Sequence, residues 1–458
     1  MASAERVLKE TLDVNHCSIT NVQFANDCNG GSVMHVYLKL HKGQAHSCPI
    51  CGKKCSWYDR KQMTEAVPYS KWRSIDLNGI KVYLYCRLGR IYCPEHGVHT
   101  AGVPWAFMGS RFTKSYDLTA CFLGMRISRK AASEFMRCDW DTIGRCIGRA
   151  RNFLEPEVKR RYENLRNIGV DETSYRKGHK YITVVVNHDT GEVVWCHEGH
   201  SIDTFSMFFE ELTQEQRDSI KTVSGDGARW IDACIEKYCP HATRTIDGFH
   251  VVCWCMEALD KVRVDCWKQA VKEFKELEKS CGKLKAGRPK DDDKNAQKLR
   301  DAKLKASSVK GSGYTVGKNP ENLTEKQKAT LEVVANTSPI LFRAYKLKEL
   351  LRGAFKLENV DDVKAILKDF FWKATHSRIS YFKELAYKIR RHEEHILNTI
   401  KTGLSNARVE SVNNKIKLFI RKAYGFRNIQ NMYDIIMLGC SNLEISLPNW
   451  GNKALKLA

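Results

Sequence analysis

The chain has 458 residues, and its 75 Lys and Arg against 53 Asp and Glu give a formal net charge of +22 at pH 7. This length allows two or three domains with real cores. Its 18 cysteines do not indicate a secreted disulfide scaffold, because the chain is too long for one and begins without an apolar signal segment. No apolar run is long enough for a membrane span. We expect a cytoplasmic protein with reduced cysteines, and its basic charge favours nucleic acid as a partner.

Residues 1–108 form the first predicted domain, in which alternating apolar and polar residues indicate small antiparallel strands, as in 32–40 and 80–93. Two tight knuckles interrupt these strands, and each supplies two potential metal ligands: Cys48 and Cys51, then Cys93 and His96. Four ligands of this kind suit one tetrahedral Zn²⁺, which would be structural because no position remains open for water. Other side chains compete for a ligand place: Cys55, Cys86, His46 and His99.

Helical spacing begins in residues 109–160, where "ISRKAASEFMRCDWDTIGRCIGRAR" (127–151) predicts two short helices around a turn. Ser128 and Asp139 suit the N-cap positions. On the second helix, Ile143 and Ile147 would be buried, while three arginines would lie toward solvent or DNA: Arg145, Arg149 and Arg151. This pattern favours a helix-turn-helix that places its second helix in the major groove, although a plain helical hairpin between domains also fits.

Residues 161–255 are predicted to begin a mixed α/β domain. Five strand-like runs are present: 167–171, 180–187, 192–197, 220–226 and 243–247. Helical patterns cover 202–213 and 228–238. Three strands joined by hairpins, followed by helix, strand, helix and strand, are the order of a mixed sheet.

Three carboxylates lie where they can converge. Asp171 and Asp226 each end a predicted strand, and Glu410 lies on a predicted helix in the last segment, 401–458. Oxygen ligands of this kind suit two Mg²⁺ or Mn²⁺ ions, which together assist an in-line displacement at phosphorus. Glu410 is the single acid among seven Lys and Arg between residues 401 and 430, which indicates a specific role.

Further residues are candidates for the same cleft. Asp247 also ends a predicted strand and is the main alternative to Asp226, while His250 either lines the cleft or is an ordinary core histidine. Glu172 would point away from Asp171 if the strand continues. The remaining candidates are amides near the cleft and basic side chains that could hold phosphates: Asn413, Asn414, Lys177, Arg229, Lys417, Arg421 and Arg427.

Residues 256–400 are predicted to be almost wholly helical, with an interruption at 281–325. Within 281–310 there are ten Lys and Arg and four Asp, with few large apolar residues. Such a composition is typical of a solvated or DNA-facing arm and equally of a disordered linker.

Long segments around the acidic residues and the first knuckle are distinctive: "GVDETSYRKGHKYITVVVNHDTGEVVW", "VSGDGARWI", "IDGFHVV", "ALDKVR", "LSNARVESVNNKIKLFIRKAYGFRN" and "CPICG". In these segments the chain resembles the insertion-sequence L-three family of bacterial transposases. The resemblance implies a multidomain α+β chain with a zinc ribbon, a helix-turn-helix and a ribonuclease-H-like catalytic domain interrupted by a helical insertion. It also implies DDE chemistry, with Asp171, Asp226 and Glu410 in the acidic roles. His96 departs from this pattern, since such ribbons often have Cys there.

We therefore expect a transposase that binds the terminal inverted repeats of its own element as double-stranded DNA, and then cuts and joins strands. Its cofactors would be two Mg²⁺ or Mn²⁺ ions per active site and one structural Zn²⁺. Because two ends must be cut and joined together, we expect a homodimer or larger assembly on DNA. Two alternatives stay open: a DNA-binding regulator without catalysis, and a nuclease that hydrolyses without joining.

Overall fold

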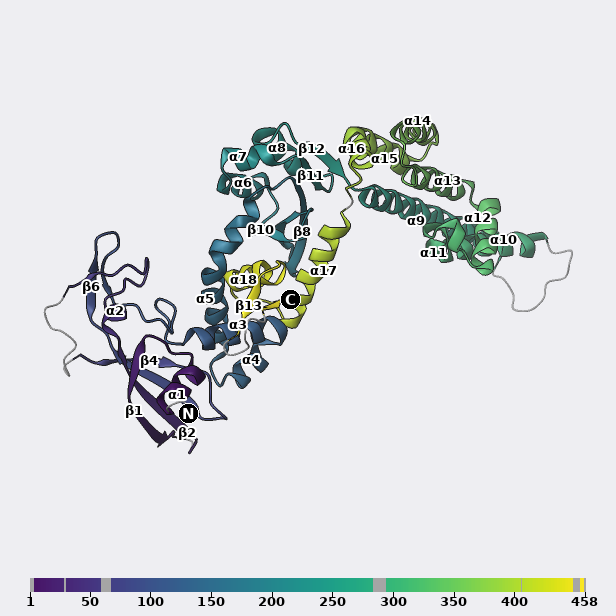
Figure 1. Cartoon of the computed structure of the whole chain (residues 1–458). Helices are drawn as coiled ribbons and strands as arrows, with labels where there is room; N and C mark the ends of the chain where they lie inside the picture. Colours follow the sequence, from purple (N-terminus) through teal and green to yellow (C-terminus); the bar gives the residue numbers. More distant parts are fainter. Residues whose placement is uncertain are drawn as a thin grey trace.

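The computed structural model describes residues 4–28, 30–58, 67–282, 294–404, 406–447 and 454–456. Three bodies follow one another along an elongated molecule (Figure 1): an N-terminal sheet domain, a central α/β core and a helical body at the far end. The core is built from two stretches of sequence, 167–247 and 406–447, and the helical body is inserted between them. The prediction of a multidomain α+β chain is confirmed. Among the described helices, none is long and apolar enough to cross a membrane.

The N-terminal domain contains a four-stranded sheet in the order β1-β2-β5-β4. Its strands are β1 (Cys17–Asn26), β2 (Ser32–Leu40), β4 (Tyr69–Arg73) and β5 (Lys81–Arg87). A smaller sheet consists of β3 (Ser56–Trp57), β6 (Arg90–Cys93) and β7 (Gly97–Thr100). Two helices complete the domain, α1 (Ala4–Leu12) and α2 (Lys42–Ala45). The predicted strand at 32–40 matches β2, whereas the run at 80–93 divides into β5 and β6.

Three helices connect this domain to the core: α3 (Lys114–Arg126), α4 (Arg129–Phe135) and α5 (Trp140–Lys159). The side chain of Ser128 accepts a hydrogen bond from the backbone of Ala131, so the predicted N-cap of α4 is confirmed. Ile143 and Ile147 are fully buried, as their spacing predicts. Helix α5 is longer than expected and continues through η1 (Arg160–Tyr162) into the core.

The core is a five-stranded sheet in the order β10-β9-β8-β11-β12. Its strands are β8 (Asn167–Arg176), β9 (Lys180–Asn187), β10 (Val193–Glu198), β11 (Thr222–Gly225) and β12 (Thr243–Ile246). The first three are antiparallel, whereas β11 and β12 run parallel to β8. All five predicted strands are present, but β8 continues to Arg176. Asp171 therefore lies within a strand and not at its end, which corrects the prediction.

Helices cover both faces of this sheet. One face carries α6 (Ile202–Glu211), α7 (Gln214–Ser219) and α8 (Arg229–Tyr238). The other face carries α5, α17 (Ala407–Lys422) and α18 (Ile429–Gly439), followed by β13 (Glu444–Ser446) and β14 (Ala454–Lys456). Alternate residues of β9 divide between the two layers, because Val184 packs with Val409 of α17 while Val185 packs with Phe205 of α6.

The helical insertion begins with α9 (Gly248–Cys281), which leaves the core and extends to the far end of the molecule (Figure 1). It continues through α10 (Lys294–Gly311), α11 (Gly313–Gly317), η2 (Pro320–Asn322), α12 (Glu325–Thr337), α13 (Pro339–Ala354), α14 (Val360–His376), α15 (Ser380–Arg391) and α16 (Glu393–Thr402). The predicted interruption of helical structure at 281–325 is wrong for residues 294–311, because these form α10, which packs on α9 and buries Leu299 and Val309. Residues 283–293 lie outside the described part of the chain.

Candidate active site

Asp171 lies on β8, and Asp226 directly follows the parallel neighbouring strand β11. Strand β11 pairs with β8 at Thr222 and Asn167, and each following pair keeps the same offset of 55 residues (222 − 167). Asp226 and Asp171 are separated by the same offset (226 − 171), so this register, continued two residues beyond its last pair, would place them at one level and on one face of the sheet. Burial raises the pKa of Asp171, and the negative charge of Asp226 contributes to this rise. The two carboxylates are therefore close enough to repel each other.

Helix α17 lies against β8 and brings the third carboxylate to the same face. A Cβ atom on Gly169 would lie 2.4 Å from Cγ2 of Val409, so only glycine allows this close approach. Asn413 donates a hydrogen bond from Nδ2 to Oδ2 of Asp171 at 2.6 Å. Glu410 is half-buried and lies one turn before Asn413, on the same face of the helix. The structure thus brings the helix that carries Glu410 to the two aspartates.

A buried polar network fixes the start of α17. Ser224 donates from Oγ to Oδ1 of Asn406 at 2.8 Å, and Nε2 of His188 lies 2.5 Å from the same hydroxyl. All three side chains are almost inaccessible to solvent. This network joins β11 to the helix of Glu410, and the sequence interpretation missed it. A serine inside an otherwise apolar strand was the only available signal.

Both carboxylate oxygens of Asp247, the predicted alternative to Asp226, accept hydrogen bonds from backbone amides. Its Oδ1 accepts from the backbone of Phe249 at 3.0 Å and caps α9, while its Oδ2 accepts from the backbone of Asn406 at 2.8 Å. Asp226 makes one such bond, from the backbone of Ala228 to Oδ1 at 3.0 Å. Its other oxygen, Oδ2, therefore stays outside that bond, which makes Asp226 the better candidate for a metal ligand.

His250 and Glu172 flank the carboxylates in different ways. His250 is half-buried, its Nε2 has no hydrogen-bond partner among the described residues, and its positive form would lower the pKa of Asp171. His250 therefore lies near Asp171 with a buried ring nitrogen that is unsatisfied, unlike an ordinary core histidine. Glu172 accepts from Nε1 of Trp230 on α8 at 3.2 Å, so it points to the opposite face, as alternation predicts.

Arg244 supports the main chain that carries Asp226. Its guanidinium is buried and donates to the carbonyl oxygens of Gly225 (3.4 Å), Thr245 (2.6 Å) and Asp226. Its Nε donates to Oδ1 of Asp232 at 2.9 Å. No sequence pattern indicates this role, because an arginine in a short strand has the pattern of an ordinary solvated charge.

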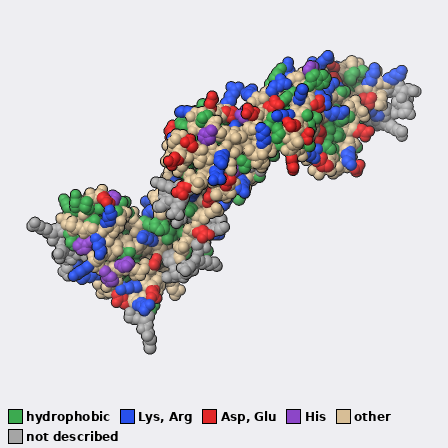
Figure 2. Space-filling view, turned by 45° about the horizontal axis from the view of Figure 1, so that its top comes forward, with side chains coloured by type: hydrophobic (Ala, Val, Ile, Leu, Met, Phe, Trp, Pro, Cys, Tyr) green, Lys and Arg blue, Asp and Glu red, His purple; other side chains and the backbone are tan. Residues whose placement is uncertain are grey.

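Most of the predicted DNA-contacting side chains lie on the surface. Five of them are exposed, on α17, the turn after it, the tip of the β8–β9 hairpin and α5: Lys417, Arg421, Arg427, Lys177 and Arg145. Asn414, predicted near the cleft, is exposed as well. On the face drawn in Figure 2, Lys and Arg are spread over the core and the insertion and alternate with Asp and Glu. The positive charge is therefore not gathered into one patch on this face.

Two arginines of α5 do not face solvent as expected. Arg149 makes two hydrogen bonds of 2.8 and 2.6 Å to the carboxylate of Asp117, which is fully buried. Arg151 donates to Oδ1 of Asp434 at 2.7 Å. Both guanidinium groups instead bind acids of the neighbouring helices α3 and α18, so the predicted orientation is wrong for Arg149 and Arg151.

The two predicted knuckles of the N-terminal domain meet in one cluster: Cys48, Cys51, Cys93 and His96, whose potential ligand atoms all lie within 4.8 Å of one another. Nδ1 of His96 lies 3.5 Å from Sγ of Cys93, and this hydrogen bond is the main cause that lowers the pKa of Cys93 to about 6. A thiol with this pKa is largely a thiolate at neutral pH, the form that binds metal.

The other predicted ligands of this domain lie in different environments. Cys55 neighbours the cluster but donates to the backbone oxygen of Lys53 at 3.3 Å. His99 lies 2.6 Å from the backbone oxygen of His96, and His46 packs on the ring of Trp57. Cys86 is buried in the core of the four-stranded sheet. The four knuckle residues are therefore the best-placed ligand set among the described residues of this domain.

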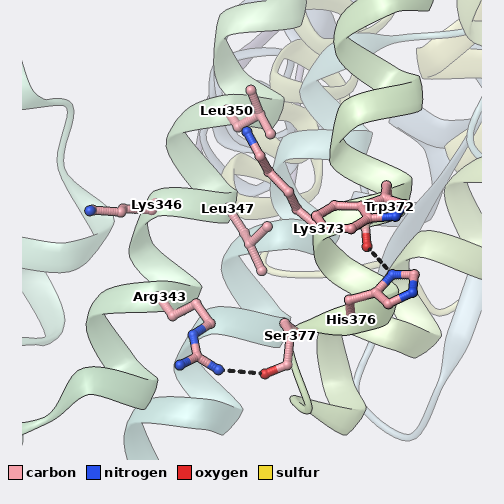
Figure 3. A pocket seen from close by; sticks show the side chains of 8 residues that line it. All are labelled: Arg343, Lys346, Leu347, Leu350, Trp372, Lys373, His376 and Ser377. Carbon is pink, nitrogen blue, oxygen red and sulfur yellow. Dashed lines mark hydrogen bonds between the residues drawn. The ribbon is translucent and has the colours of Figure 1, made fainter.

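A hollow of about 490 Å³ lies on the helical insertion, away from all these residues. Helix α13 and the end of α14 form its walls (Figure 3): Arg343, Lys346, Leu347, Leu350, Trp372, Lys373, His376 and Ser377. Its cations are held by the insertion itself, since Arg343 donates to the backbone oxygen of Ser377 and Lys373 pairs with Asp369. No carboxylate of the core reaches this hollow, so it is separate from the candidate active site.

Comparisons with known proteins identify the family of the chain. A family model described as "Transposase" (DDE_Tnp_ISL3) matches residues 168–436, which include all three carboxylates. The transposase for insertion sequence element IS1557 of Mycobacterium tuberculosis is 37% identical over 435 residues, covering 95% of each chain, in strains CDC 1551 and H37Rv. The transposase for insertion sequence element IS1001 of Bordetella parapertussis is 24% identical over 403 residues, which cover 87% of this chain and 89% of that protein.

Proposed function

The chain belongs to the ISL3 family of insertion-sequence transposases, and we propose that Asp171, Asp226 and Glu410 form its DDE active site. The single observation that carries this proposal is the parallel pairing of β8, which carries Asp171, with β11, which ends directly before Asp226, beneath the helix of Glu410. The reaction would be cleavage of DNA strands at the ends of its own element, followed by joining of the freed 3′ ends to target DNA.

The carboxylates fit a pair of hard divalent cations. Two acids that repel each other at a half-buried position are stabilised when cations with oxygen preference bind between them. We propose that Asp171, Asp226 and Glu410 would together hold two Mg²⁺ ions. When bound, such ions generate the nucleophile from water and stabilise the departing oxygen.

The surrounding residues would set the geometry of this site. Asn413 orients the Asp171 carboxylate through its hydrogen bond, and Arg244 holds the carbonyl groups beside Asp226. His250, with Nε2 free of protein partners in the described structure, would lie beside the scissile phosphate and donate to it. These contacts fix ligands before DNA binds, which lowers the cost of reaching the reactive geometry.

The domain assignment follows the same proposal. Three hairpin-linked strands followed by two parallel strands support a ribonuclease-H-like core in 161–255 and 401–458, with 256–400 as its insertion. The cysteine cluster supports a zinc ribbon in 1–108. Helices α3 to α5 support a helix-turn-helix in 109–160, with Arg145 as its exposed contact to DNA.

Recognition of double-stranded terminal repeats would use the N-terminal domains, and strand transfer would use two copies of the core. Each active site acts on one DNA end, so we propose that the chain works as a homodimer or larger assembly on DNA. Exposed cations of α17 and of the β8–β9 hairpin would hold phosphates near the cleft: Lys417, Arg421, Arg427 and Lys177.

The test is cleavage of a duplex that carries the element's own terminal sequence, with Mg²⁺ or with EDTA. We expect nicking with Mg²⁺ only, and Asp226→Asn should lose it by about 10³-fold or more, since metal contacts supply several kcal/mol to the transition state. Glu215→Gln on α7, an exposed acid, is the charge-matched control and should cut normally. Metal-dependent cutting by Asp226→Asn would refute the proposed triad.

A further inference from the structure

A second group of potential metal ligands lies where the core meets the helical insertion. Asp232 on α8, His392 at the junction of α15 and α16, and His395 in the first turn of α16 present ligand atoms within 4.8 Å of one another. The two histidines are three positions apart, which places them on one side of the helix. All three residues are distinct from the carboxylate site and from the cysteine cluster.

The two imidazoles have polar atoms that the fold leaves unsatisfied. Nδ1 of His392 and Nδ1 of His395 are buried, and neither has a hydrogen-bond partner within the described chain. His392 is only 3% exposed. A buried polar atom without a partner is costly and is usually explained by a bound water or ion.

Asp232 is oriented for the same position by Arg244. Nε of Arg244 donates to Oδ1 of Asp232 at 2.9 Å, which leaves Oδ2 outside this bond. Outer-sphere hydrogen bonds of this kind commonly orient carboxylates that bind metals. Since Arg244 already offsets part of the negative charge, a hard cation that depends on several carboxylates would bind poorly. Two neutral imidazoles and one carboxylate instead suit a transition metal of the zinc type.

We propose that Asp232, His392 and His395 bind one Zn²⁺ ion that ties the helical insertion to the core. Three protein ligands would leave the fourth tetrahedral position to water. The ion would also steady the segment after Asp226, because a Cβ on Gly227 would lie 3.2 Å from Nε2 of His392. His392 and His395 would thus act as positioning residues. The proposal does not depend on the proposed function, since none of the three residues belongs to the triad.

The test is the zinc content of the purified full-length chain after loading and removal of weakly bound metal. We expect about two zinc ions per chain in the wild type, and about one after either His392→Gln/His395→Gln or Cys48→Ser/Cys51→Ser. His376→Gln is the matched control, because this exposed histidine of the insertion already bonds through Nδ1 to the backbone oxygen of Trp372. It should retain both ions.

Two results would overturn the proposal. One is a wild type with a single zinc that the Cys48→Ser/Cys51→Ser variant loses, and the other is an unchanged zinc content in the histidine variant. A third result would support this site and refute the zinc ribbon: a wild type with a single zinc that the cysteine variant keeps and the histidine variant loses. The DNA-cleavage assay is separate, so failure of the triad and failure of this site are distinguishable.

A second measurement covers the case in which the histidine variant fails to fold. Wild-type protein is titrated with Co²⁺, and the cysteine cluster should give thiolate-to-metal charge-transfer absorption. A further equivalent should then add ligand-field bands without charge transfer, as nitrogen and oxygen ligands require. Saturation after the thiolate site alone would overturn the proposal. Hydrogen exchange completes the test, since bound zinc should slow exchange in 226–232 of the wild type.

Discussion

The cysteine cluster and the carboxylate site are built in opposite ways. The cysteine cluster consists of two local knuckles, in which Cys48 and Cys51 or Cys93 and His96 lie within four residues of sequence. The carboxylates come from two strands and a distant helix, and 239 residues separate Glu410 from Asp171 (410 − 171). The cysteine cluster could therefore be predicted from spacing alone, whereas the candidate active site depends on strand register and helix packing.

The supports of the two sites differ in the same way. The first knuckle is closed by its own backbone, where Gly52 adopts a positive φ of 71° and donates to the carbonyl oxygen of Cys48 at 3.0 Å. The carboxylates depend on residues from other elements, among them Gly169, Arg244 and Asn406. A substitution in the cysteine cluster should therefore disturb only that cluster, whereas a substitution at the carboxylate site should disturb several elements of the core.

The largest expected effect comes from Glu410→Gln, which removes one carboxylate while it keeps the shape of the side chain. Cleavage should fall by about 10³-fold or more, since an acid that binds metal contributes several kcal/mol to the transition state. Zinc content and specific binding to the terminal sequence should not change, because the cysteine cluster is independent of α17. Gel-based cleavage, zinc analysis and a binding titration check these three outcomes. A variant that still cuts at the wild-type rate would remove Glu410 from the site.

Cys48→Ser tests the role of the cysteine cluster. Loss of one thiolate should release the N-terminal zinc and weaken specific DNA binding by about 10–100-fold, because zinc binding supplies folding free energy in small metal domains. The core should keep its melting transition and its Mg²⁺-dependent activity on high concentrations of DNA. Cys86→Ser is the matched control. Because the thiol of Cys86 is buried in the sheet core and is not one of the four knuckle residues, this variant should retain zinc. Unchanged zinc and binding in Cys48→Ser would exclude the assignment.

A smaller effect is expected from Asn413→Ala, which removes a neighbour of the site and none of its proposed ligands. Loss of the 2.6 Å bond to Asp171 should lower cleavage by about 10–100-fold, as is usual for outer-sphere partners of metal ligands. Higher Mg²⁺ should restore part of the activity, because the lost interaction orients a ligand. Asn414→Ala changes the next residue, which is exposed, and should have little effect. Equal losses in both variants would refute the positioning role of Asn413.

Sequence patterns predicted the parts that depend on short-range order. Strand β9 occupies the residues that alternation and its hairpin turn indicate, 180–187, and the offset of 55 between the aspartates follows from the order of the strands. The length of β8 was not predictable, because four of its last five residues (176 − 171) are polar or charged and their strand conformation depends on pairing with β9. Helix α10 was missed for a related reason, since only three of its 18 residues are buried.

Partners that are distant in sequence explain the remaining errors. Arg149 and Arg151 have the spacing of surface charges, and nothing on their own helix marks them as buried ion-pair members. Their acids are Asp117 on α3 and Asp434 on α18, and Asp434 is 283 residues from Arg151. The orientation of a charged side chain therefore depends on the tertiary partner, which local periodicity does not contain.

The smallest expected effect concerns the free energy of unfolding, and it tests whether the carboxylates of Asp171 and Asp226 repel each other. Burial and the charge of Asp226 raise the pKa of Asp171, so ionisation of Asp171 disfavours the folded state above that pKa. Asp171→Asn should therefore raise the free energy of unfolding by about 0.5–2 kcal/mol at pH 8 in EDTA, even though it abolishes cleavage. The gain should shrink as the pH falls and Asp171 becomes protonated in the wild type. Chemical unfolding between pH 4 and 8 measures this difference, with Asp189→Asn on the surface as control. A variant that is less stable at pH 8 would show that the carboxylates do not repel each other, and it would weaken the case that a cation belongs between them.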